Sequence, residues 1–150
     1  MSPVKRWLIE TPSGHRSTCR HGASYFDAPV HDRSIAKHAF LLLSDPENPG
    51  KFANPLTYAS QLDDAGHEVA VYFDGAATLW FDGYEQWAGP AVEAYERARD
   101  AGLIAGVCDH CATAMDVVDA VEREGFEIDG SAHAPDVAGL SEEGYELHMV

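Results

Sequence analysis

Three short, unbroken apolar runs constrain the fold of this chain more than any other feature of its sequence. They lie at residues 39–43, 69–73 and 103–107, and a segment with helical spacing of apolar residues follows each of them. Strands that are apolar on both faces are typical of parallel sheets, in which helices cover both sides. Short strands that alternate with helices form right-handed β-α-β units. The pattern therefore predicts an α/β domain built on a parallel sheet.

The segments between the runs carry ordinary start and stop signals of helices. A proline or a polar capping residue opens each segment and a glycine follows its end. The predicted helices lie between residues 54 and 66, 90 and 102, and 109 and 125. Two further short segments, at residues 126–128 and 145–149, predict two more strands. We therefore expect a mostly parallel sheet of five strands, covered on both faces, over residues 38–150.

Charge divides the chain into two parts. Residues 1–37 carry six Lys/Arg against three Asp/Glu, and residues 38–150 carry four against 22. The first part has no clear periodicity and is rich in polar residues, which predicts an N-terminal arm with little fixed structure. The acidic second part repels phosphates and anionic lipids, so we expect neither nucleic acid nor a membrane as partner. Without a signal-peptide pattern, the expected location is the cytoplasm, where thiols stay reduced.

Cys108 and Cys111 form a C-x-x-C motif at the point where the third apolar run meets a predicted helix. The unpaired N–H groups at a helix N-terminus carry partial positive charge, which lowers the pKa of a nearby thiol. We expect Asp109 to be the N-cap of this helix and Cys111 to lie in its first turn. His110 is placed to move a proton at neutral pH. The candidate catalytic residues are therefore Cys108, His110 and Cys111.

The predicted topology also indicates where a ligand would bind. In open parallel sheets, ligands bind beyond the carboxyl ends of the strands. Three loops reach that edge, at residues 44–51, 73–78 and 108–111. Lys51 is the only basic residue between Lys37 and Arg97, and it either holds an anion, lowers the pKa of a thiol, or is a solvated loop lysine. The predicted pocket-lining residues are Ser44, Asp45, Lys51, Asp74, Gly75 and Asp109.

Four aromatic residues crowd the segment that follows the second apolar run. They are Trp80, Phe81, Tyr84 and Trp87. Such a group lines a pocket, forms a subunit contact, or packs onto its own domain. The sequence leaves these three alternatives open.

Zinc binding, a cycling disulfide and simple burial compete with nucleophilic chemistry as explanations of the C-x-x-C motif. A structural zinc site needs four ligands, and only Asp109, His110 and His133 stand as candidates to complete this pair. A thioredoxin-like dithiol is expected after an early strand, whereas this pair follows the third. Cysteine also behaves as a small buried hydrophobe. We expect no metal and no cofactor, with a redox or metal pair and structural cysteines as the alternatives.

Residues 38–150 resemble the DsrE/DsrF-like family, which includes sulfur-relay subunits of the TusD type. The resemblance rests on four stretches, which are residues 44–46 (SDP), 66–75 (GHEVAVYFDG), 107–112 (VCDHCA) and 140–147 (LSEEGYEL). It implies a three-layer α/β/α fold and a trimer or hexamer. It also implies a sulfur carrier or sulfurtransferase with a persulfide on Cys108 and a helper thiol at Cys111. Protein thiols would donate and accept the sulfur. The alternative is an oligomeric binding module without enzymatic activity.

Overall fold

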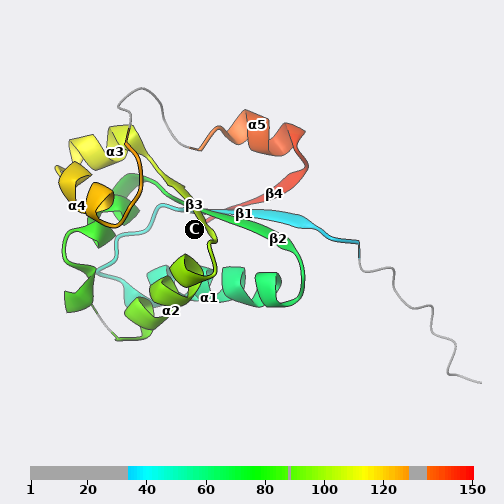
Figure 1. Cartoon of the computed structure of the whole chain (residues 1–150), viewed down its shortest axis with the longest axis horizontal. Helices are drawn as coiled ribbons and strands as arrows, with labels where there is room; N and C mark the ends of the chain where they lie inside the picture. The colour runs from blue at the N-terminus through cyan, green and yellow to red at the C-terminus, as the bar shows by residue number, and fades with distance from the viewer. Residues whose placement is uncertain (1–33, 88, 129–134) are drawn as a thin grey trace, which may run out of the picture. The chain divides into compact units, whose positions relative to one another are not determined.

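The computed structural model describes residues 34–87, 89–128 and 135–150, and these residues contain a parallel sheet of four strands (Figure 1). The strands are β1 (Lys37–Leu42), β2 (Glu68–Phe73), β3 (Ile104–Val107) and β4 (Tyr145–Met149). Their order is β3-β2-β1-β4, and every pair is parallel. The α/β class with a parallel sheet is therefore confirmed. Most of the arm predicted over residues 1–37 lies outside the described residues.

The alternation of side chains along β1 explains why residues 39–43 form an unbroken apolar run. Phe40 and Leu42 point into the main core, and Ala39 and Leu41 point into a smaller cluster with Leu140. The main core lies under helices α1 (Pro49–Asp64) and α2 (Gly89–Asp100), and the smaller cluster lies under α5 (Val137–Glu142). Figure 1 shows α1 and α2 on one side of the sheet and α5 on the other.

The prediction of a fifth strand at residues 126–128 is wrong, because this segment pairs with no strand within the described residues. Phe126 and Ile128 are partly buried and pack against the main core. The ring of Phe126 meets that of Phe81 edge-on, with 5.6 Å between centroids. Only two apolar side chains are available here, and burying them against the core outweighs the few ladder hydrogen bonds that three residues could form.

The aromatic segment after β2 packs onto its own domain. It forms two short 3-10 helices, η1 (Gly75–Phe81) and η2 (Tyr84–Gln86). Trp80 is fully buried, with its ring stacked on Phe52 at 4.4 Å and edge-on to Tyr95 at 5.3 Å between centroids. These contacts join the connector to α1 and α2, so the aromatic group belongs to the core of the domain.

Helix α1 begins before the predicted start at residue 54. The side-chain oxygen of Asn48 accepts the N–H of Lys51 at 3.3 Å, and Pro49 is the first helical residue. Asn-Pro occurs twice in this stretch, and the earlier pair is the cap. The earlier start places Phe52 on the buried face of the helix, against Trp80. Pro55 consequently lies inside α1.

The helix predicted between residues 109 and 125 is divided into α3 (Asp109–Ala114) and α4 (Val118–Arg123). The break lies at Asp116, which has a left-handed backbone with φ of 58°. Asp is one of the few residues other than glycine that tolerate this conformation. Met115 is exposed as a result, and Val117 is buried. None of the described helices is long and apolar enough to cross a bilayer.

The early start of α1 makes Phe52 a large contributor to stability. We expect Phe52→Ala to lower the free energy of unfolding by about 3–5 kcal/mol, since it leaves a cavity beside Trp80. The matched control is Tyr58→Ala on the same helix, because Tyr58 is 52% exposed; its cost should be about 0.5 kcal/mol. Urea denaturation measures both. Equal effects of the two substitutions would show that α1 does not bury Phe52.

Candidate thiol site

The carboxyl ends of β2 and β3 bring Asp74, Cys108 and Cys111 together. The N–H of Cys108 donates to the carbonyl of Phe73 at 2.8 Å, so the ladder between the two strands places Cys108 beside the residue that precedes Asp74. Cys111 lies in the first turn of α3, and its Sγ donates to Oδ1 of Asp74 at 3.1 Å. The ligand atoms of the three side chains all lie within 4.8 Å of one another. The two loops at residues 73–78 and 108–111 therefore form one thiol site.

Cys108, and not Asp109, occupies the N-cap position of α3. Its φ of −68° and ψ of 113° still belong to the extended strand, so the helix begins one residue earlier than expected. Asp109 is the first residue of the helix and is 8% exposed. Its carboxylate interacts favourably with the N-terminal end of the helix. That negative charge, together with a helix of only six residues, reduces the electrostatic activation of the thiols.

The two thiols have different environments. Cys108 is 0% exposed, whereas Cys111 is partly exposed, and the two sulfurs form no disulfide. Burial first, and then hydrogen bonds with Asp74 and Cys108, raise the pKa of Cys111 to about 12. Cys111 therefore keeps its proton at neutral pH. The helix N-terminus was predicted to lower the pKa of a nearby thiol, and at Cys111 the pKa is raised instead, because the side chain is desolvated by burial and the carboxylate of Asp74 faces the sulfur.

Asp74 is held in place by the turn that it begins. Its Oδ1 accepts the N–H of Gly75 at 2.7 Å and caps η1, so the same oxygen binds both a backbone N–H and the thiol of Cys111. Gly75 has a left-handed φ of 51°, which favours glycine at this position. Both residues were predicted at this edge from the order of the strands, and the structure places them against Cys111. His110 lies between the two cysteines in sequence, and its side chain is exposed.

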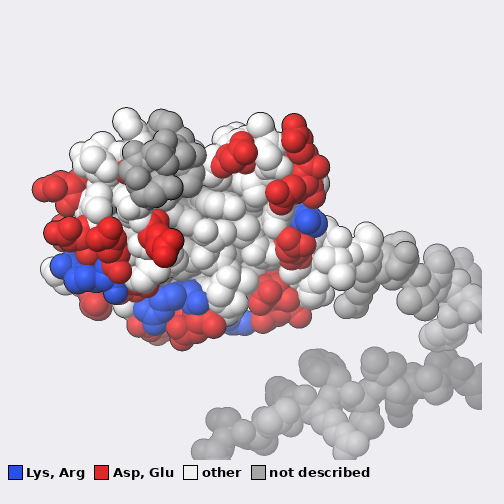
Figure 2. Space-filling view, turned by 45° about the horizontal axis from the view of Figure 1, so that its top comes forward, with Lys and Arg blue, Asp and Glu red and all other residues white. Residues whose placement is uncertain are grey.

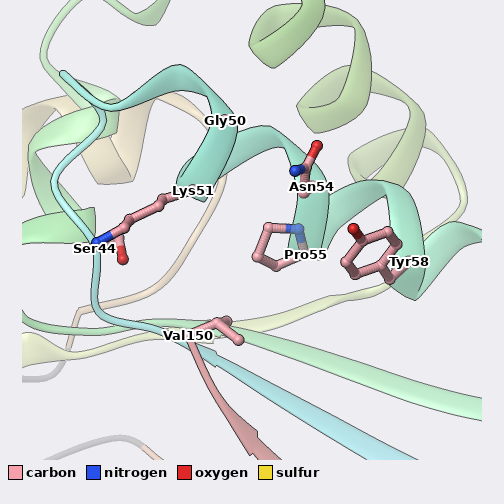
Figure 3. Close-up of a pocket in the computed structure, with 7 residues that line it drawn as sticks. All are labelled: Ser44, Gly50, Lys51, Asn54, Pro55, Tyr58 and Val150. Carbon is pink, nitrogen blue, oxygen red and sulfur yellow. The ribbon is translucent and has the colours of Figure 1, made fainter.

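Ser44 and Lys51, predicted for the same site, line a separate pocket of about 430 Å³ (Figure 3). The other lining residues are Gly50, Asn54, Pro55, Tyr58 and Val150. Neither Cys108 nor Cys111 is among the residues that line this pocket, and Lys51 is not among the three side chains grouped at the thiol site. Asp45, predicted beside them, is exposed, and its Oδ1 accepts the N–H of Glu47 at 2.8 Å. Asp45 thus stabilises a turn, as Asp often does in loops.

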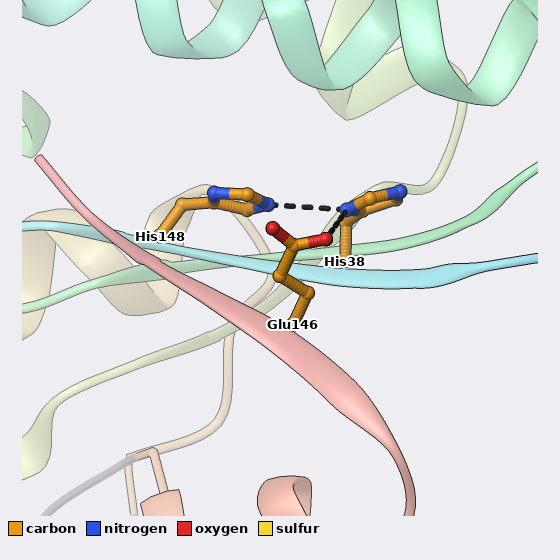
Figure 4. Close-up of side chains that lie close together, drawn as sticks. All are labelled: His38, Glu146 and His148. Atoms are coloured by element: carbon orange, nitrogen blue, oxygen red, sulfur yellow. Dashed lines mark hydrogen bonds and ion pairs between the residues drawn. The ribbon is translucent and has the colours of Figure 1, made fainter.

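A second cluster of polar side chains lies on the sheet itself and was missed in the sequence. It consists of His38 on β1 and of Glu146 and His148 on β4 (Figure 4). The pKa of His38 is lowered, mainly by burial and then by His148, so this imidazole is neutral at neutral pH. The available signal was the alternation Glu146-Leu147-His148 in a predicted strand, because residues two apart share a face.

The hydrogen bond from Cys111 to Asp74 predicts an unusual pH profile of alkylation. With a pKa of about 12, the thiolate fraction of Cys111 keeps rising with pH where an ordinary thiol of pKa about 8.5 levels off. Asp74→Asn removes the opposing charge and should shift the profile to lower pH. Asp45→Asn is the matched control and should leave it unchanged. Peptide mapping after timed iodoacetamide treatment measures each cysteine, and a plateau near the ordinary pKa in the unsubstituted protein contradicts the prediction.

No family model and no curated protein matches this chain. The resemblance to the DsrE/DsrF-like family therefore stays a prediction. The chemistry of the two thiols and of Asp74 is the basis on which a function can be inferred.

Proposed function

We propose that this protein is a cytoplasmic sulfur carrier of sulfurtransferase type, with a persulfide on Cys108 and Cys111 as the helper thiol. The observation that carries the proposal is the convergence of two thiols and a carboxylate at the carboxyl edge of a parallel sheet. Helices on both sides of the sheet support the three-layer α/β/α fold that the resemblance implies. The same resemblance implies a trimer or hexamer, which sedimentation measures directly.

Loading of sulfur is an exchange between a thiol and a donor persulfide. The sulfur of Cys108 attacks the outer sulfur of the donor, a new S–S bond forms, and the S–S bond of the donor breaks. The donor leaves as a thiolate and takes up the proton that the thiol of Cys108 has lost. Asp74 is the neighbouring carboxylate that can pass this proton on. Delivery is the reverse reaction with an acceptor thiol, which returns Cys108 to its starting form.

The proton on Cys111 protects a persulfide on Cys108 from early loss. If Cys111 were a thiolate, it would attack the inner sulfur, form a disulfide with Cys108 and release hydrosulfide. Its raised pKa keeps the attacking thiolate scarce at neutral pH. The dithiol thereby favours carrying sulfur over cycling through a disulfide, and this distinction separates the proposal from a redox pair.

The burial of Cys108 favours a second candidate function. A sulfur atom that is 0% exposed meets a donor only when the short helix α3 moves. If α3 stays in place, Cys108 is a core residue and the protein is a binding module without sulfur chemistry. The two candidates differ in whether the folded protein takes up sulfur at all.

The acidic surface restricts which donors approach the thiol site. Residues 38–150 carry 22 Asp/Glu against four Lys/Arg. Figure 2 shows groups of acidic side chains around the margin of the face in view, with basic ones beside them along its lower edge and an uncharged area at its centre. A surface of this charge attracts cationic reactants and repels anionic ones. The protein partner in sulfur transfer is therefore expected to present a basic face.

Persulfide loading is the direct test of the carrier. After incubation with glutathione persulfide, intact-mass spectrometry should show one added sulfur atom, and peptide mapping should place it on Cys108. Cys108→Ser should lose the added sulfur, and Cys111→Ser should retain it. No uptake by the folded protein favours the binding module. Retention in Cys108→Ser with loss in Cys111→Ser would assign the carrier to Cys111, and rapid disulfide formation with sulfide release would indicate a redox pair.

Donor charge gives an independent test of the acidic surface. At low ionic strength, a cationic donor such as cysteamine persulfide should load the protein faster than anionic glutathione persulfide. The ratio of the two rates should fall as salt is added, because salt screens exposed charges beyond about 10 Å at 0.1 M. As a control, the rate at which each donor transfers sulfur to free cysteine is measured. This rate corrects for the difference in intrinsic reactivity between the two donors. A ratio that does not change with salt argues against electrostatic selection of donors.

A further inference from the structure

We propose that His38, Glu146 and His148 bind a divalent transition-metal ion, for which zinc is the natural candidate. The three side chains project from the same face of the sheet, and their ligand atoms lie within 4.8 Å of one another (Figure 4). Two imidazole nitrogens and a carboxylate oxygen form a donor set that suits zinc. This site uses neither cysteine, so the proposal is independent of sulfur transfer.

The spacing of the donor atoms matches tetrahedral coordination. Nδ1 of His38 lies 3.1 Å from Nε2 of His148 and 3.6 Å from Oε2 of Glu146. Zinc bonds of about 2.0–2.1 Å at tetrahedral angles place neighbouring ligand atoms roughly 3.3–3.4 Å apart. The two observed distances lie on either side of that value. Small side-chain adjustments would therefore admit the ion, with the backbone of both strands in place.

The strands and the neighbouring rings hold the ligands in position. Register pairs His38 with Glu146 and Phe40 with His148, so β1 and β4 present all three ligands on one face. The ring of His148 stacks on Phe40 at 4.7 Å and on His38 at 5.3 Å between centroids. His67 meets the ring of His38 edge-on at 5.4 Å. The imidazoles are therefore ordered before any ion binds.

A hydrogen bond alone accounts less well for this arrangement. One proton between the two imidazoles satisfies a single pair of atoms, yet both His148 and the carboxylate of Glu146 face Nδ1 of His38. A cation interacts favourably with all three lone pairs at once. The side chain of Glu146 is 69% exposed, which leaves the fourth coordination position open to water. Three protein ligands with an open fourth position are typical of reactive zinc sites.

Titration of the chelator-treated full-length protein with zinc tests the site. Calorimetry should show that His148→Ala and Glu146→Gln each weaken one zinc-binding event by roughly tenfold or more, since even changes outside the ligand sphere of known sites have effects of that size. Glu47→Gln is the matched control, because it removes an exposed carboxylate that lies outside the cluster. The histidines within residues 1–33 are present in every variant, so any zinc that they bind contributes equally to each titration.

Cobalt provides a second readout that separates this site from the two thiols. Bound Co²⁺ should show the visible bands of tetrahedral nitrogen and oxygen ligation, and His148→Ala should abolish them while its thermal unfolding without metal remains cooperative. Zinc and cobalt binding that is unchanged in both His148→Ala and Glu146→Gln would overturn the proposal. A spectrum dominated by thiolate charge transfer that persists in these variants would also overturn it, and would assign the metal to Cys108 and Cys111.

Discussion

The parallel ladder through β1 is the constraint on which the rest of the described structure depends. β1 pairs with β2 along one edge and with β4 along the other, and both of its faces are buried. Because the strands run in the same direction, their carboxyl ends meet at one edge, where Asp74 and Cys108 lie together. Because side chains alternate along a strand, the same ladder sets His38 beside Glu146. The thiol site results from the pairing of β2 with β3, and the histidine cluster results from the pairing of β1 with β4.

Features decided by a few neighbouring residues were predictable from the sequence, and features decided by distant packing were not. Unbroken apolar runs predicted β1, β2 and β3, because burial on both faces removes the polar alternation, and β4 was predicted from a short segment in which apolar and polar residues alternate. Asn48 and Asn54 each precede a proline, and only the burial of Phe52 against a distant tryptophan selects the first as the cap. The backbone reversal at Asp116 carries no glycine to mark it, so a single long helix was predicted where two short ones form.

The candidate sites likewise combine features that the sequence predicts with features that depend on distant packing. Strand order alone predicts that Asp74 and Cys108 meet, since each follows the end of a neighbouring parallel strand. Cys111 keeps its proton because it is partly buried and because its thiol donates to Asp74 in another loop at 3.1 Å. The C-x-x-C spacing predicts neither the burial nor this hydrogen bond. The pairing of His38 with β4 depends on which strand becomes the neighbour of β1, and that choice is made by the whole sheet.

The pairing of β1 with β4 brings together side chains that are 110 residues apart in the chain, His38 and His148. A link at this point closes almost the whole described domain into one loop. The entropy that an unfolded chain loses on closure grows only slowly with loop length, yet for a loop near 100 residues it corresponds to about 4–5 kcal/mol when the link is covalent. An ion bound between β1 and β4 would link the two ends of the described domain reversibly. The free metal concentration would then determine how often β1 and β4 separate.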